Sequence, residues 1–475
     1  MLTKSVLLLF VLLCSVSSSL AQSVGAVKLP DDIRGQRVSA FVALVNSTDD
    51  QSLREFVSKE MAPKPDLTIE ERVNRFRKLR ENVGPATLRR VLEVGREEIN
   101  FLLETKKGEW LRVRLALDPD SQNQIAGLEM NLTDAAAMQS NAAPQAKISE
   151  SDLGQTIQSY LSGLNKADEF SGVVLVAKNG TPVFSGAYGL ASKEFDVPNR
   201  VDTKFNLGSL NKLFTTLAIG QLVDAGKLSF DDPIAKYLPD YPNRQAAEKV
   251  TIKHLLTMSS GIGDFFGEKY EGIAKDRLRT LADFLPLFAG QPLGFEPGTK
   301  RRYSNGGFIV LGLIIEKASG ENYFDYVRDH IFKVAGMENT GHYEADVVTP
   351  NLASGYSLRL APGSGSRRNN IFSRPLRGSS AGGGYSTVED LLKFANALDS
   401  KKLAIPASLS AQVPDIPGGG LANGVGAAGG APGINAEFDT KVAGDYTIVV
   451  LSNYDPPAAE KVGKQVRAWL TGKTN

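Results

Sequence analysis

The stretch Phe205-Asn-Leu-Gly-Ser209-Leu-Asn-Lys212 places a serine three residues before a lysine, directly ahead of an apolar run. Residues at i and i+3 on a helix share one face, so the two side chains can meet. A serine hydroxyl becomes a good nucleophile when a nearby base takes its proton. A lysine can be that base when burial or neighbouring positive charge destabilises its ammonium form. The spacing therefore indicates acyl transfer by a Ser-Lys pair.

A second motif, Tyr303-Ser-Asn305, lies 94 residues after Ser209 and precedes an apolar helix expected over 308–315. A tyrosine phenol can relay a proton if neighbouring cations lower its pKa, or if it acts as a hydrogen-bond shuttle. Asn305 offers an amide donor and acceptor, suited to Lys212 or to a substrate carbonyl. The alternative interpretation is a loop tyrosine followed by an asparagine helix cap.

These motifs are followed by a glycine-rich strand late in the chain, and this order resembles the serine β-lactamase and penicillin-binding-protein superfamily. The flanking sequence is similar to the class C branch, which includes D-aminopeptidases, D,D-carboxypeptidases and related esterases. The resemblance covers about residues 150–475. The further stretches that carry it are Gly226-Lys-Leu-Ser-Phe-Asp-Asp-Pro-Ile234, Lys236-Tyr-Leu-Pro239, Ile252-Lys-His-Leu-Leu-Thr-Met-Ser-Ser-Gly261 and Ala381-Gly-Gly-Gly-Tyr-Ser-Thr-Val-Glu-Asp-Leu391.

The resemblance implies an α/β (α+β) domain with a central antiparallel sheet, flanking helices and a helical subdomain. It implies that Ser209 is the acylated nucleophile, Lys212 the base and Tyr303 the proton relay. Asn305 would orient Lys212 and the substrate. Ser209 would stand at the N-terminus of a buried helix, where the backbone amides favour negative charge. Its own N–H and one from the late strand would form the oxyanion hole.

The third motif departs from the family. The family has Lys-Thr-Gly or His-x-Gly there, whereas this chain has Gly426-Ala-Ala-Gly-Gly-Ala-Pro-Gly433. Ala427 takes the place of the basic or imidazole side chain. Gly429 and Gly430 keep the strand slim, so the amide of Gly430 can approach a substrate carbonyl. Losing one charge-assisted contact costs about 1.5–3 kcal/mol, or about 10–150-fold. Neutral ester or amide substrates are therefore favoured over substrates with a free carboxylate.

Arg301 and Arg302 stand directly before the tyrosine of the second motif. Such a pair is usually a solvated pair of charges. The alternative is that one arginine supplies the positive field that the third motif lost.

The chain is expected to begin with a secretory signal peptide at residues 1–21. Lys4 supplies its charge, residues 6–13 its apolar segment and Ser19-Leu-Ala21 its cleavage site. The alternative is a membrane anchor, but the apolar run is too short, so no stable membrane span is expected after cleavage. The expected location is secreted or periplasmic.

Two domains are expected after the signal. Residues 29–132 are predicted to form a small α+β domain that resembles the cystatin-like cone folds, residues 133–147 a linker, and residues 148–475 the β-lactamase-like domain. In the first domain we expect helices at 35–45, 53–61 and 69–82, then strands at 86–94, 99–104, 110–117 and 125–132.

The composition and charge of the chain limit the kinds of binding partner and cofactor that we expect. A hydrophobic fraction of 42% is typical of a globular protein, and a net charge of +1 gives no reason to expect nucleic acid. Cys14 is the only cysteine and lies in the predicted signal, so disulfides and thiol catalysis are excluded after cleavage. His254, His330 and His342 have no metal-ligand spacing. We therefore predict no metal and no cofactor.

Two functions remain open. The first is an exported serine hydrolase that acts through an acyl-enzyme on a small-molecule or peptide substrate with an ester, amide or lactam carbonyl. The second is a catalytically weakened β-lactamase-like binding or scaffold protein that lost turnover with the third motif. The presence of Ser209, Lys212, Tyr303 and Asn305 together favours the enzyme.

Overall fold

The computed structural model describes residues 27–63, 68–95, 97–118, 121–133, 147–360, 366–413 and 424–472. The chain divides into two compact units, Met1–Ala142 and Ala143–Asn475, called here the N-terminal and C-terminal units. The expected signal peptide at residues 1–21 lies outside the described residues, as does nearly all of the expected linker at 133–147.

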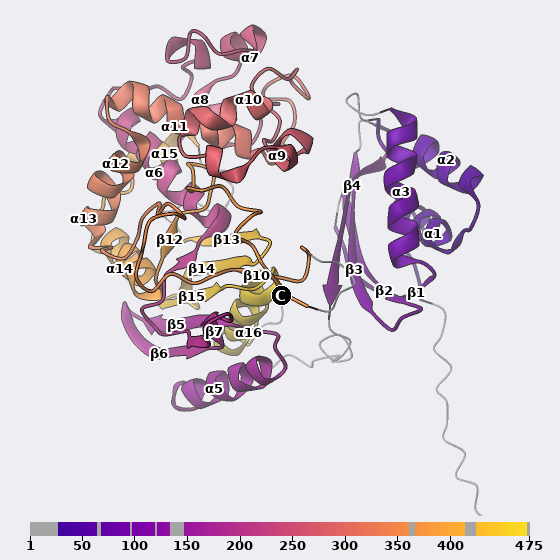
Figure 1. Cartoon of the computed structure of the whole chain (residues 1–475), viewed down its shortest axis with the longest axis horizontal. Helices are drawn as coiled ribbons and strands as arrows, with labels where there is room; N and C mark the ends of the chain where they lie inside the picture. Colours follow the sequence, from indigo (N-terminus) through magenta and orange to yellow (C-terminus); the bar gives the residue numbers. More distant parts are fainter. Residues whose placement is uncertain are drawn as a thin grey trace, which may run out of the picture. The chain divides into compact units, whose positions relative to one another are not determined.

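The N-terminal unit packs helices on one face of an antiparallel meander (Figure 1). Phe41, Phe101 and Val113 are fully buried between the two layers. Three helices precede four strands, as the sequence predicts, and the observed bounds differ from the expected ones by a few residues at most. Whether this unit shares the cystatin-like fold stays a prediction. Its elements are α1 (Ile33–Asn46), α2 (Asp50–Lys59), α3 (Ile69–Val83), β1 (Ala86–Val94), β2 (Glu98–Thr105), β3 (Trp110–Asp118) and β4 (Gln124–Thr133).

The C-terminal unit is built on a five-stranded antiparallel sheet in the order β13-β14-β15-β5-β6. Two strands come from the start of the unit and three from its end. The strand bounds are β5 (Gly172–Lys178), β6 (Thr181–Tyr188), β13 (Gly426–Ala431), β14 (Ile434–Val442) and β15 (Tyr446–Ser452). Because β13 is at the edge of this sheet, one side of its backbone faces the rest of the unit.

Both faces of this sheet are covered, which is why β5 is apolar and buried from Val173 to Ala177. Val174 and Val176 pack toward α5 (Glu150–Lys166) and α16 (Ala458–Thr471), which lie on the same side of the sheet in Figure 1. Alternate residues such as Val173 pack in the larger core on the other face. The alternation follows from the period of two of a strand.

Two helices in the larger core position the site. The first, α6 (Lys212–Asp224), follows the 3-10 turn η2 (Gly208–Asn211) and is buried on nearly all sides. The second, α11 (Asn305–Ser319), packs against α6 and ends at Gly320, whose φ of +79° is readily adopted by glycine.

The other elements of this unit are short helices and two-stranded ladders around the core. They are β7 (Leu190–Ser192), β8 (Val197–Pro198), β9 (Phe205–Asn206), η3 (Ile234–Lys236), α7 (Arg244–Lys249), α8 (Ile252–Leu256), α9 (Glu268–Gly272), η4 (Lys275–Arg277), η5 (Leu281–Phe284), α10 (Leu285–Phe288), α12 (Tyr323–Val327), the π-turn η6 (Arg328–Phe332), α13 (Lys333–Ala335), β10 (Tyr356–Ser357), β11 (Arg368–Asn369), β12 (Tyr385–Ser386), α14 (Val388–Asp399) and α15 (Ala407–Gln412). No helix of the described residues combines the length and the apolar character needed to cross a membrane.

Candidate active site

Ser209 lies in the 3-10 turn and Lys212 is the first residue of α6. Side chains at i and i+3 eclipse in a 3-10 turn, which brings the two together more closely than an α-helix would. Lys212 Nζ lies 3.2 Å from Ser209 Oγ. Ser209 as a whole is partly exposed. The serine thus precedes the buried helix by one short turn.

The Lys212 side chain is enclosed, with 8% of the residue exposed. Its amine also donates to Asn305 Oδ1 at 2.7 Å and to the backbone carbonyl of Ala381. The ring centroid of Phe308 lies 5.4 Å away. Burial lowers the pKa of Lys212 to about 7, and the negative charge of Asp264 opposes part of that shift. A large share of the amine is therefore uncharged near neutral pH.

Tyr303 approaches the serine from the other side. Its hydroxyl donates to Ser209 Oγ at 2.6 Å, although 51% of the residue is exposed. Burial around the hydroxyl raises the pKa of Tyr303, the hydrogen bond to Ser209 lowers it, and the charge of Asp264 raises it. The residue is therefore a neutral phenol at neutral pH. Of the two routes open from the sequence, this favours the hydrogen-bond shuttle.

Arg302 does not direct its charge at Tyr303. Arg302 directs its guanidinium at the ring of Phe295, 5.6 Å from the centroid. The groups that shift the pKa of Tyr303 are its own burial, Ser209 and Asp264, and the net shift is upward. A cation acting on the phenol would lower that pKa.

Asn305 is the first residue of α11 and not its cap, so the helix-cap interpretation is wrong. Ser304 is the cap, and its Oγ accepts from the backbone N–H of Gly307 at 2.9 Å. The amide of Asn305 is therefore free to bridge two groups. Its Oδ1 accepts from Lys212, and its Nδ2 donates to Asp264 Oδ2 at 2.8 Å.

Strand β13 passes directly beside the serine turn. A Cβ on Gly429 would lie 1.9 Å from the carbonyl oxygen of Leu207 and 2.9 Å from the backbone nitrogen of Ser209. Gly208 has a φ of +51°, and a Cβ there would lie 2.8 Å from the nitrogen of Gly430. Only glycines allow this approach. The expected third motif thus lies next to the serine.

Ala427 occupies the same strand and brings no charge to the site. It packs as a partly buried side chain against the larger apolar core. The strand therefore supplies backbone groups near Ser209 without the cation that the resemblance would place there.

Sequence reasoning missed two members of the cluster. Asp264 follows Gly261-Ile-Gly263, a pattern that is typical of a turn, and its contact with Asn305 spans 41 residues. Ala381 contributes a backbone carbonyl, which leaves no side-chain signal. The only sequence signal for it was the glycine run at 382–384, which belongs to a stretch that carries the family resemblance.

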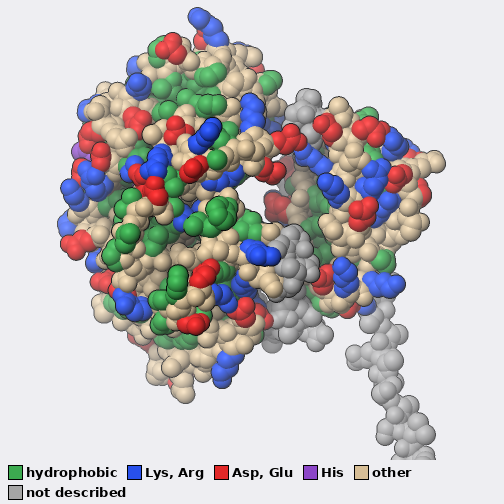
Figure 2. Space-filling view, in the orientation of Figure 1, with side chains coloured by type: hydrophobic (Ala, Val, Ile, Leu, Met, Phe, Trp, Pro, Cys, Tyr) green, Lys and Arg blue, Asp and Glu red, His purple; other side chains and the backbone are tan. Residues whose placement is uncertain are grey.

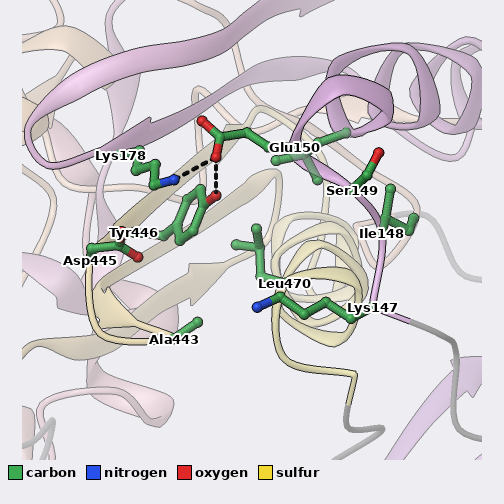
Figure 3. Close-up of a pocket in the computed structure, with 10 residues that line it drawn as sticks. Lys147, Ile148, Ser149, Glu150, Lys178, Ala443, Asp445, Tyr446 and Leu470 are labelled. Carbon is green, nitrogen blue, oxygen red and sulfur yellow. Dashed lines mark hydrogen bonds and ion pairs between the residues drawn. The ribbon is translucent and has the colours of Figure 1, made fainter.

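A hollow of about 520 Å³ lies elsewhere in this unit, between the start of α5 and the end of α16 (Figure 3). Glu150 contacts Lys178 and Tyr446 there. Lys178 pairs with Tyr446 at one end of β15, whereas the β13 turn pairs through β14 with Ser452 at the other end. Seven residues of strand separate the two ends by about 20 Å. The hollow is therefore not part of the Ser209 cluster.

Surface charge is mixed over the face of the molecule seen in Figure 2, where Lys and Arg alternate with Asp and Glu. Among the side chains of the described ranges, no three His, Cys, Asp or Glu residues are grouped so that they could hold a metal ion.

The comparisons with known proteins decide the family. The profile of the family described as Beta-lactamase matches residues 157–473. The chain belongs to the beta-lactamase family.

The chain is similar to the putative penicillin-binding protein PbpX of Bacillus subtilis (strain 168), with 33% identity over 54% of this chain and 61% of that protein. It is also similar to esterase EstB of Burkholderia gladioli, with 30% identity over 50% of this chain and 68% of that protein. The chain thus spans less than two thirds of PbpX. The crystal structure of a penicillin-binding protein from Bacillus halodurans matches with a TM-score of 0.57 and 32% identity, over 65% of this chain and 99% of that one. The expected β-lactamase-like α/β fold is confirmed.

Proposed function

We propose that the chain is a serine hydrolase that works through an acyl-enzyme at Ser209. The observation that carries this proposal is the buried Lys212 amine, 3.2 Å from Ser209 Oγ, whose pKa burial lowers to about 7. A base with that pKa can accept the serine proton at neutral pH. A relative that is named an esterase supports the same class of reaction.

Acylation follows from the contacts of the cluster. The Lys212 amine takes the proton of Ser209 while Oγ attacks the substrate carbonyl carbon, and the carbonyl oxygen becomes an oxyanion. Tyr303, hydrogen-bonded to Ser209, passes a proton from Lys212 to the leaving group. The bond to the leaving group breaks and an ester on Oγ remains. Water then attacks the ester carbon while Lys212 takes its proton. The bond to Oγ breaks, the acid is released and the proton returns from Lys212 to the serine.

The oxyanion hole would be formed by the backbone N–H groups of Ser209 and Gly430. The pair Ala431 and Ile434 closes the two-residue turn between β13 and β14. Hydrogen-bonded pairs alternate along such a ladder, so the N–H of Gly430 would point away from β14 and toward the serine turn. Gly429 allows the approach because it lacks a side chain. Two donors preset for the oxyanion are a large source of rate acceleration.

We further propose that the substrates are esters, amides or lactams that carry no charge beside the scissile bond. Ala427 stands where the family has a cation that can bind a carboxylate, and it packs into apolar surroundings. A substrate carboxylate would therefore lose a contact worth about 1.5–3 kcal/mol. Export to a periplasm or the outside also remains a proposal, which rests on the signal-like sequence of residues 1–21.

The direct test uses a nitrophenyl ester as substrate. We expect Ser209→Ala and Lys212→Ala each to remove turnover, with melting temperatures that show both variants folded. Full turnover in both variants would reject the proposed mechanism.

A second candidate function, a binding or scaffold protein without turnover, is favoured by one observation, the uncharged Ala427 in the third motif. A fluorophosphonate separates the two candidates. A mass shift on the peptide that contains Ser209 supports the enzyme, and a folded but unlabelled protein supports the binder.

A further inference from the structure

Asp264 lies behind Asn305, on the side away from Lys212. Its Oδ2 accepts from Asn305 Nδ2 at 2.8 Å and from the backbone N–H of Asn305 at 3.1 Å. We propose that Asp264 is a positioning residue that acts through Asn305 to aim the free electron pair of Lys212 at the Ser209 hydroxyl. The inference rests on the proposed roles of Ser209 and Lys212, and it adds a residue to which the motifs assign no part.

The first step is the orientation of the Asn305 amide. An asparagine presents an oxygen on one side and an NH₂ group on the other, and an ionised carboxylate only accepts hydrogen bonds. The carboxylate of Asp264 therefore holds the NH₂ group, and the Oδ1 atom is left to face Lys212. Without the carboxylate both amide orientations become possible, and the reversed one would point its NH₂ group at the lysine.

The second step is the orientation of the amine. A neutral lysine amine has two N–H bonds and one free electron pair. Asn305 Oδ1 and the Ala381 carbonyl can only accept, so together they take both N–H bonds. The remaining hydrogen-bond partner of Lys212 is Ser209 Oγ, and the free pair then points there. A reversed Asn305 would instead donate to that pair and compete with the serine proton.

The same arrangement serves the charged state that follows proton transfer. The proton leaves Ser209 Oγ and forms a third N–H bond on Lys212. The resulting ammonium has Asn305 Oδ1, the Ala381 carbonyl and the serine oxygen as its acceptors. No co-reactant is needed, because one proton has moved between two atoms.

The loop that carries Asp264 is itself fixed at two points. Asp264 Oδ1 accepts from the backbone N–H of Phe266 at 3.0 Å, so both carboxylate oxygens have partners. Ser304 Oγ donates to the carbonyl of Gly263 at 2.9 Å, which ties the loop to the start of α11. The loop of Asp264 and the start of α11 are therefore tied to each other, which keeps the carboxylate in contact with Asn305.

Asp264 also acts on the site through its charge. The side chains that contact the Lys212 amine include Ser209, Tyr303, Asn305 and Phe308, none of which is charged at neutral pH. Asp264 is the charged group that shifts the pKa of Lys212, and it shifts it upward. Removing the carboxylate while keeping its shape should therefore move the lysine titration to lower pH.

These two effects give a test on the full chain with Asp264→Asn. We expect kcat/KM for a nitrophenyl ester to fall by about 10–100-fold, with the change mainly in kcat, because a misdirected base loses part of its catalytic effect. We also expect the acid limb of the pH profile to move to lower pH. The matched control is Glu268→Gln, which removes one exposed carboxylate four residues further along. It should change neither quantity.

Two further measurements keep the outcome clear. In the folded protein, an NMR titration of labelled lysine side chains should report a lower pKa for Lys212 in Asp264→Asn. In a double-mutant cycle, adding Asp264→Asn to Asn305→Ala should cost much less than Asp264→Asn alone, because both changes disrupt one contact.

The inference is overturned if wild-type hydrolysis depends on Ser209 while Asp264→Asn keeps its rate and its acid limb. It is also overturned if the variant loses rate only in proportion to lost folded protein, with an unchanged lysine titration. A wild-type chain without any Ser209-dependent hydrolysis would instead refute the proposed function, and the positioning role with it.

Discussion

The pH dependence of hydrolysis follows from the burial of one amine. Burial lowers the pKa of Lys212 from its ordinary 10.5 to about 7. The proposed base works only when it is uncharged, so kcat/KM should be low in acid and should rise as the lysine loses its proton. With a pKa of about 7, roughly one tenth of the amine is neutral at pH 6, about half at pH 7 and about nine tenths at pH 8.

The expected profile is a rise of about tenfold between pH 6 and pH 8, followed by a plateau. A lysine with an ordinary pKa would give a rise of about 100-fold over the same range and would continue to rise to about pH 10. The raised pKa of Tyr303 keeps the phenol protonated across this range, so no second limb should interrupt the plateau below pH 9. Lys212 and Tyr303 both hydrogen-bond to Ser209, so the pKa read from the rate profile belongs to the coupled pair and not to Lys212 alone.

The assay is the initial rate of nitrophenyl ester hydrolysis between pH 5 and pH 9, read where nitrophenol and nitrophenolate absorb equally. The Ser209→Ala variant, measured in parallel, gives the background to subtract. A melting curve at each pH shows that the protein stays folded. A rate that still increases tenfold per pH unit above pH 8 would refute the account of a buried, largely neutral lysine.

Three substitutions test other parts of the site. Gly429→Ala should reduce kcat more than tenfold, because its Cβ would lie 1.9 Å from a carbonyl oxygen of the serine turn; Gly426→Ala on the same strand, where the nearest atom is 3.4 Å away, should keep the wild-type rate. Tyr303→Phe should lower kcat by about 10²–10⁴-fold without a change in melting temperature, because the residue is half exposed; an unchanged kcat would remove the phenol from the mechanism. Ala427→Lys should raise kcat/KM for a substrate with a free carboxylate by about 10–150-fold relative to its neutral ester; equal effects on both substrates would contradict the proposed preference.

The sequence predicted the parts of the site that depend on local spacing. Ser209 and Lys212 are three residues apart, so the helical turn alone brings them together. Tyr303 and Asn305 are distant in sequence, and only the order of motifs linked them to the serine. The lack of side chains in the β13 glycines predicted a close approach of this strand to the substrate carbonyl. The structure shows how close the strand lies to the serine turn, in the short distances that a Cβ would create.

The parts that the sequence did not predict depend on tertiary contacts or on backbone atoms. Asp264 meets Asn305 across 41 residues, and an aspartate after a glycine turn is usually a turn residue. The Ala381 carbonyl has no signal in its side chain. Serine and asparagine both suit a helix cap, so the sequence alone does not distinguish Ser304 from Asn305 as the cap of α11. The observed hydrogen bond from the Gly307 N–H identifies Ser304.

The elements of the fold were predicted best where apolar residues recur with a clear period. Strand β3 alternates buried residues such as Val113 and Leu115 with more exposed ones, and the predicted 110–117 differs from Trp110–Asp118 by one residue. The helix expected at 308–315 is longer at both ends, as Asn305–Ser319, because its first turn is polar and glycine-rich and its last turn carries charge. Caps and not apolar spacing set those limits.

In the proposed mechanism, Ser209 forms a covalent acyl-type bond because Lys212 activates it. The most direct measurement is the mass of the protein and of its peptides after brief treatment with a fluorophosphonate at pH 8. We predict one adduct, located on Ser209, that is absent in Ser209→Ala and forms much more slowly in Lys212→Ala. A folded wild-type protein without an adduct, or with the adduct on another residue, would contradict the account.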